Sequence, residues 1–74
     1  MTRPIQLLDV VALTEDIANR NLNRGQVGTV VEWLDEGVFE IEFSDDQGRT
    51  YATLAVPEKK LMVLYHQPVP VASS

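Results

Sequence analysis

The side chains of this chain that are numerous and closely spaced enough to suggest a chemical role are the carboxylates of Asp and Glu. The 74-residue sequence holds eleven Asp and Glu against six Lys and Arg, which gives a formal net charge of −5. Seven of the eleven acids fall within residues 32–46, and these are Glu32, Asp35, Glu36, Glu40, Glu42, Asp45 and Asp46. A surface with this charge repels phosphate backbones and attracts basic protein surfaces. We therefore expect this chain to bind a partner through electrostatic attraction.

The other reactive side chains do not form a catalytic pattern. The sequence has no cysteine, which excludes disulfides and thiol chemistry, and its single histidine, His66, has no adjacent carboxylate in sequence to orient it as a base. Asp45 and Asp46 belong to a turn that contains glycine, but the ligand spacing of a calcium loop is missing. We predict a non-enzymatic protein without catalytic, cofactor-binding or metal-binding residues.

Short apolar runs separated by polar turns predict the elements that carry these acids. The chain alternates between runs of β-forming residues and clusters of Asn, Asp and Gly, which is typical of strands and turns. We expect strands at Val10–Leu13, Gln26–Leu34, Val38–Phe43, Thr50–Ala55 and Leu61–Tyr65, with a long loop at Glu15–Arg24. Pro57–Lys60 suits a single 3₁₀ turn before the last strand, since proline fits a first helical position.

The second and third expected strands form a hairpin around Asp35–Glu36–Gly37, which we predict to be a three-residue turn. Counting back from this turn places Trp33 opposite Phe39, Val31 opposite Ile41 and Thr29 opposite Phe43. By the period of two, these six residues share one face, which we predict to be the core. The other face then carries Glu32, Glu40 and Glu42 together with Val30, Leu34 and Val38, and Glu32 lies opposite Glu40.

The fourth expected strand pairs with the third and adds one aromatic residue to the exposed surface. This pairing directs Thr50, Ala52 and Leu54 inward and Tyr51 and Thr53 outward, whereas a pairing shifted by one residue reverses the assignment. Tyr51 and Tyr65 are then the exposed aromatic residues, too few for the aromatic groove that a proline-rich peptide needs.

Five strands with a long first loop and a helical turn before the last strand predict an all-β fold, a small SH3-like barrel. The segments LLDVVALTED, RGQVGTVVE, FEIEF and GRTYATL resemble a family of small bacterial and cyanobacterial proteins catalogued as domain of unknown function 4926. The resemblance covers residues 7 to about 64. It implies this fold and carries no catalytic residue across, and it suggests a paired partner protein.

Gly25 and Gly28 resemble the KOW turn of ribosomal and transcription-elongation proteins. A barrel strand of this kind needs the same turn, because glycine adopts positive φ at little steric cost. A nucleic-acid surface would also need a basic groove with exposed aromatics. The basic residues are instead scattered, at Arg20, Arg24, Arg49, Lys59 and Lys60. The two glycines therefore indicate a turn that the fold requires rather than a nucleic-acid-binding surface.

These observations predict the organisation and function of the chain. We expect an N-terminal extension at 1–6, one barrel domain at 7–66 and a flexible tail at 67–74, cytoplasmic, without a membrane segment, and monomeric or weakly dimeric. The predicted function is an acidic module that engages a basic partner protein in an accessory or antitoxin-like role. Its expected contact residues are Glu32, Asp35, Glu36, Glu40, Glu42 and Tyr51. A KOW-like nucleic-acid-binding domain and a structural homodimer remain alternatives.

Overall fold

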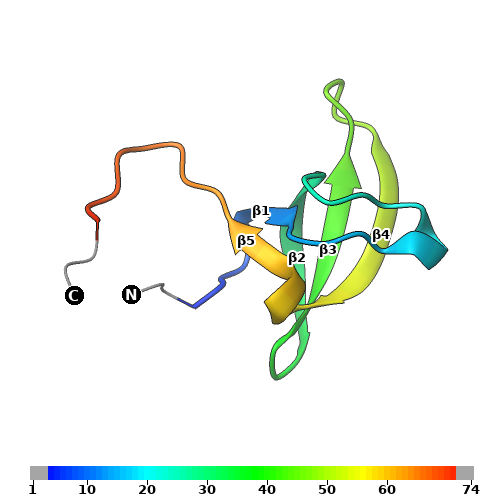
Figure 1. Cartoon of the computed structure of the whole chain (residues 1–74), viewed down its shortest axis with the longest axis horizontal. Coiled ribbons are helices and arrows are strands. Elements are labelled where there is room, and N and C mark those ends of the chain that lie inside the picture. The colour runs from blue at the N-terminus through cyan, green and yellow to red at the C-terminus, as the bar shows by residue number, and fades with distance from the viewer. Residues whose placement is uncertain (1–3, 72–74) are drawn as a thin grey trace.

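The computed structural model describes residues 4–71, which form one antiparallel sheet of five strands (Figure 1). The strands are β1 (Val10–Leu13), β2 (Val27–Asp35), β3 (Val38–Ser44), β4 (Thr50–Pro57) and β5 (Leu61–Val63). Two 3₁₀ turns, η1 (Ala18–Arg20) and η2 (Glu58–Lys60), lie in the first loop and before β5. The strand order is β4-β3-β2-β1-β5, with consecutive strands β2, β3 and β4 forming a meander.

The predicted all-β fold is confirmed, but the sheet is open. Strands β4 and β5 stand at its two ends, and within residues 4–71 no ladder joins them. In Figure 1, β1 and β5 run across the direction of β2, β3 and β4, so the sheet is strongly bent. The predicted closed barrel is therefore not observed, and the architecture is a bent, five-stranded antiparallel sheet.

Strand β3 supplies the centre of the core. Its residues alternate between buried and partly exposed along the whole strand, with Phe39, Ile41 and Phe43 buried. These side chains pack with buried residues of every other strand and of the first loop, namely Val11, Leu13, Leu22, Val30, Leu54, Val56 and Leu61. The period of two correctly predicted the inward face of this strand.

The predicted inward face of β2 is wrong, because the strand contains a bulge. The register pairs Trp33 with Phe39, as predicted, but pairs Val30 rather than Val31 with Ile41. Val31 is the extra residue of the bulge, and beyond it the alternation is reversed. Val30 is consequently fully buried and Val31 is 37% exposed. The bulge also brings Gly28 instead of Thr29 opposite Phe43.

Trp33 was predicted to be a core residue, and this too is wrong, since 64% of it is exposed. Strand β1 pairs with β2 only at residues 27–29. The contact extends to Val30, whose carbonyl accepts from the Leu8 N–H and whose N–H donates to the Asp9 carbonyl. Within residues 4–71, the half of β2 that carries Trp33 therefore has β3 on one side and no paired strand on the other. The indole is left mostly in solvent.

The β2–β3 turn contains two residues rather than the predicted three. Asp35 pairs with Val38, so the loop is Glu36–Gly37, and Gly37 has the expected positive φ of 70°. Leu34 is the extra residue of a second irregularity between Trp33 and Asp35. This shift keeps the predicted Trp33–Phe39 pair even though the loop is shorter.

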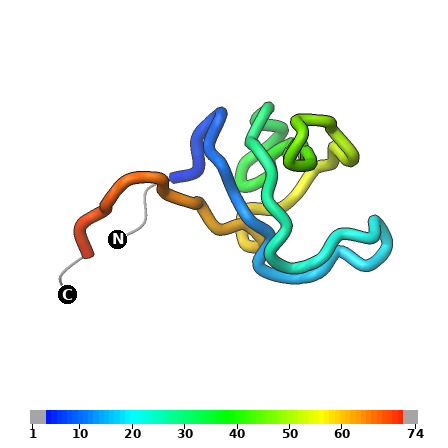
Figure 2. Tube along the Cα trace, turned by 90° about the horizontal axis from the view of Figure 1, so that it is seen from above, coloured from blue at the N-terminus to red at the C-terminus, as the bar shows by residue number. Residues whose placement is uncertain are grey.

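The first loop contributes to the core although most of its residues are polar. Ile17 and Leu22 pair in an isolated bridge around η1, and Leu22 is 2% exposed. Figures 1 and 2 show the first loop lying over one face of the sheet. Gly25 closes the loop with a φ of 92°, as expected for a turn glycine. Gly28 has a different role, because a Cβ there would lie 2.6 Å from Cγ2 of Ile41.

The last two strands follow the predicted order with shifted bounds. β4 extends to Pro57, and its Ala52 and Leu54 face the core as expected, whereas Thr50 is exposed. A register shift after Phe43 leaves Tyr51 as the extra residue of a bulge. The predicted 3₁₀ turn is confirmed as η2, with Pro57 as its N-cap, and β5 ends at Val63 rather than Tyr65.

The ends of the predicted terminal segments lie outside the described residues, at 1–3 and 72–74. The extension at 1–6 and the flexible tail at 67–74 stay predictions. Across residues 4–71, the structure contains no helix long and apolar enough to span a membrane.

Candidate acidic binding face

The outer face of β2, β3 and β4 brings three predicted contact residues together. Glu40 and Glu42 alternate with the buried residues of β3, so their side chains lie on the side of the sheet away from the core. Glu32 of β2 is directly opposite Glu40, as predicted. On the other side of β3, Ala55 of β4 is opposite Glu40 and Thr53 is opposite Glu42. We call Glu32, Glu40 and Glu42 the acidic row.

Within the described residues, no Lys or Arg forms an ion pair with the acidic row. Opposed residues of antiparallel strands hold their Cβ atoms about 5 Å apart, so the Glu32–Glu40 pair is mutually repulsive. Among residues 4–71, the ion pairs join Arg49 to Asp45 at 3.3 Å and Lys60 to Glu15 at 3.8 Å, and neither reaches the row. The residues opposite Glu40 and Glu42 on β4, Ala55 and Thr53, are small, and both glutamates are partly exposed.

The other predicted contact residues are placed differently. Asp35 ends β2 and accepts a hydrogen bond from the Glu36 backbone N–H at 2.7 Å, so both acids lie at the hairpin turn. Tyr51 packs its ring against the core residue Phe43, with 6.3 Å between ring centroids, and its hydroxyl accepts a hydrogen bond from the Gln26 amide at 2.9 Å. The structure thus groups Asp35 and Glu36 beyond the end of the row and sets Tyr51 apart from it.

Asp45 has a structural role in the β3–β4 turn. Its Oδ1 accepts hydrogen bonds from the backbone N–H groups of Gln47 and Arg49, both at 2.9 Å. The Arg49 backbone bond, together with the Gln47 bond and the Arg49 side chain, lowers the pKa of the Asp45 carboxyl, and desolvation opposes this shift. This carboxylate organises the turn around Gly48, whose φ is 81°. Asp46 beside it is exposed.

The exposure of Trp33 is a feature that sequence reasoning missed. Trp33 is 64% exposed near the hairpin turn, and the next residue, Leu34, which was predicted on the outer face, is 43% exposed. The predicted alternation had assigned the indole to the core. A paired strand beside this half of β2 would have buried it, and no local sequence signal reports that such a strand is missing.

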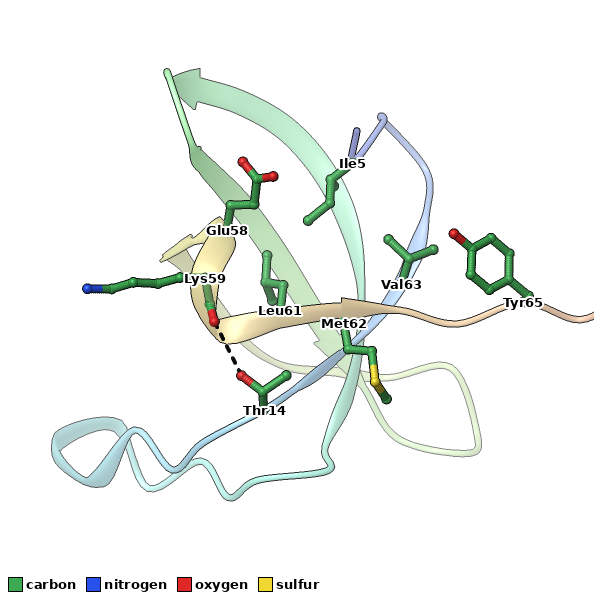
Figure 3. A pocket seen from close by; sticks show the side chains of 8 residues that line it. All are labelled: Ile5, Thr14, Glu58, Lys59, Leu61, Met62, Val63 and Tyr65. Atoms are coloured by element: carbon green, nitrogen blue, oxygen red, sulfur yellow. Dashed lines mark hydrogen bonds between the residues drawn. The ribbon is translucent and has the colours of Figure 1, made fainter. Parts of the chain in front are cut away.

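A second feature absent from the predicted site is an open groove along β5 (Figure 3). It measures about 640 Å³, and its apolar lining is Ile5, Leu61, Met62, Val63 and Tyr65. Lys59 and Glu58 border it, and the Thr14 hydroxyl donates to the Lys59 carbonyl at 3.5 Å. Because the strand order is β4-β3-β2-β1-β5, this groove and β4 lie at opposite ends of the sheet.

The remaining candidate chemistry is dispersed. His66 is exposed and lines a shallow hollow with Asp9 and Leu64. Throughout residues 4–71, no three His, Asp or Glu side chains gather closely enough to hold a metal ion. Arg20 and Arg24 both belong to the first loop, where Asp16 accepts the Arg24 backbone N–H at 2.7 Å.

Fold and site together define a small all-β protein with an acidic sheet face. The chain belongs to the family described as Domain of unknown function (DUF4926), whose model matches residues 7–63. This match supports the predicted family and covers all five strands. No curated protein and no solved structure matched the chain.

Proposed function

We propose that this protein is a non-enzymatic binding module that engages a basic partner protein through the acidic face, in an accessory or antitoxin-like role. The observation that carries the proposal is the Glu32–Glu40 register, which holds two carboxylates opposite each other with Glu42 beside them. Like charges in this arrangement destabilise a sheet, and a basic partner would relieve the repulsion.

The hairpin turn supplies a second kind of contact for the same partner. Trp33 is exposed near Asp35, and tryptophan is among the residues that most often dominate binding energy at protein interfaces. Because Trp33 is opposite the inward residue Phe39, its indole lies on the face opposite the acidic row. A partner that contacts both would extend around the hairpin turn, with Lys or Arg on the acidic face and an apolar pocket for the indole. The carboxylates speed the encounter, and the indole slows dissociation.

The fold and cellular setting are part of the proposal. We propose that the sheet is of the SH3-like barrel type, supported by the β2-β3-β4 meander, the 3₁₀ turn before β5 and the pairing of β5 with β1. We also propose a bacterial, cytoplasmic protein. The resemblance of its segments to small bacterial proteins and the absence of cysteine support this setting.

The experiment neutralises the acidic row without changing its shape. Tagged wild-type protein is used to capture and identify a partner, and association rates are then measured across salt concentrations for wild type and for a Glu32→Gln, Glu40→Gln, Glu42→Gln variant. We expect the variant to remain folded and to associate about tenfold or more slowly at low salt, with a flatter salt dependence.

A matched control separates the acidic face from net charge. Asp16→Asn, Asp46→Asn and Glu58→Gln remove the same three charges at exposed positions outside the acidic row. We expect this control to retain most of the wild-type rate. Equal slowing of both variants would contradict the proposed face, and unchanged binding by the acidic-row variant would contradict the proposed function.

A further inference from the structure

Strand β4 ends the sheet with backbone groups that no other strand uses. The Glu58 N–H donates to the Gly37 carbonyl at 2.8 Å, which fixes which residues of β4 face β3. Alternate residues of an antiparallel strand direct their N–H and C=O groups to the same side. The register is continuous from Val38–Pro57 to Phe43–Ala52. The backbone N–H and C=O groups of Val56, Leu54 and Ala52 therefore point toward β3. Thr53 and Ala55 direct their backbone groups to the free edge.

This edge is regular between two features that limit strand pairing, the bulge at Tyr51 and Pro57, which has no N–H. Between them, residues 52–56 contain no charged side chain and pair with β3 without a bulge. Lysines, bulges and very short strands are the common protections of an edge. β5 is only three residues long and follows Lys59 and Lys60, and the free half of β2 is interrupted at Val31 and Leu34. Among these edges, β4 has the longest regular stretch, Ala52–Val56.

The acidic row specifies which strand would fit there. A strand added to β4 would lie about 10 Å from β3, twice the usual strand spacing. Side chains opposite Thr53 and Ala55 would then stand on the outer face, in line with Glu42 and Glu40. Because Thr53 and Ala55 are small, a long Lys or Arg side chain could extend across β4 to these carboxylates. Acidic or bulky side chains would not fit this arrangement.

We propose that β4 accepts an extended segment of a partner protein as a sixth strand, with Lys or Arg at alternate positions directed to Glu40 and Glu42. The inference rests on the proposed function and adds how the partner is held. Backbone hydrogen bonds to Thr53 and Ala55 provide affinity, and the alternating cations select the sequence and its register.

The test uses a capped nine-residue peptide that alternates Thr and Lys, with its dissociation constant measured by titration at low salt. Ala55→Pro removes one edge N–H and adds a ring, a change that edge strands tolerate. We expect it to weaken binding about tenfold or more, whereas the Ala55→Ser control, which keeps the N–H, retains affinity. Wild-type protein should show a similar loss for a peptide methylated at its lysine backbone nitrogens, which needs no protein variant.

The outcomes distinguish the two proposals. A Glu40→Gln, Glu42→Gln variant should weaken binding and flatten its salt dependence, and a peptide with Glu in place of Lys should not bind. If wild type does not bind the Thr-Lys peptide, or if Ala55→Pro and backbone methylation leave its affinity unchanged, strand addition is overturned. If only the Glu substitutions have no effect, the proposed acidic binding function fails. A dimer that Ala55→Pro dissociates would assign the edge to a second copy and overturn the inference.

Discussion

The two faces of β3 have opposite effects on the stability of the fold. Phe39, Ile41 and Phe43 are 8%, 0% and 0% exposed and join the core, whereas Glu40 and Glu42 alternate with them on the outer face. The inner face stabilises the fold by removing apolar area from water, about 25 cal/mol for each Å². The outer face adds like charges that oppose folding. One strand therefore carries a stabilising apolar face and a charged face, and substitutions on its two faces should have different consequences.

The largest expected effect is at the centre of the inner face. Ile41→Ala removes a fully buried side chain that pairs with Val30 and Leu54, and it should lower the free energy of unfolding by about 2 to 5 kcal/mol. Chemical denaturation measures this loss. Trp33→Ala is the control, because it removes a larger but 64% exposed side chain and should cost less. A greater loss for Trp33→Ala would contradict the assignment of the core.

A smaller effect is expected from adding a single carbon to the inner face. In Gly28→Ala the new Cβ would lie 2.6 Å from Ile41 Cγ2 and 3.0 Å from the Glu42 carbonyl oxygen. Because the backbone oxygen cannot move freely, we expect a loss of about 1 to 3 kcal/mol. Thr29→Ala, at the next position and opposite Glu42, should cost less in the same thermal or chemical denaturation. Wild-type stability of Gly28→Ala would mean that the close packing at this position is wrong.

The smallest effect should have the opposite sign. Glu40→Gln removes the repulsion from Glu32 and keeps the size of the side chain, so it should raise the free energy of unfolding by about 0.2 to 1 kcal/mol at low salt. The gain should shrink as added salt screens the charges. A loss of stability that is independent of salt would show that the Glu40 carboxylate makes a favourable contact, and the contrast between the two faces would be lost.

Local sequence was sufficient where one signal dominated. The strict alternation of β3 predicted its inward residues, since only one face of the strand is apolar. Gly37 and the polar segment that contains Gly48 predicted turns, and Pro57 predicted the 3₁₀ turn before β5. The Glu32–Glu40 pair at the centre of the candidate site was also predictable from the sequence, because the irregularity at Leu34 compensated for the shorter turn.

Tertiary structure decided the positions where the local pattern is ambiguous. Val30 and Val31 are equally apolar, so alternation cannot select between them, and the bulge that buries Val30 depends on how β2 fits between β1 and β3. Leu22 is buried because the first loop packs on the core, and Trp33 is exposed because β1 ends too early to cover it. Sequence determined the apolar and acidic faces of β3. Only the three-dimensional pairing decided which surfaces are covered, because burial depends on neighbours that are distant in the chain.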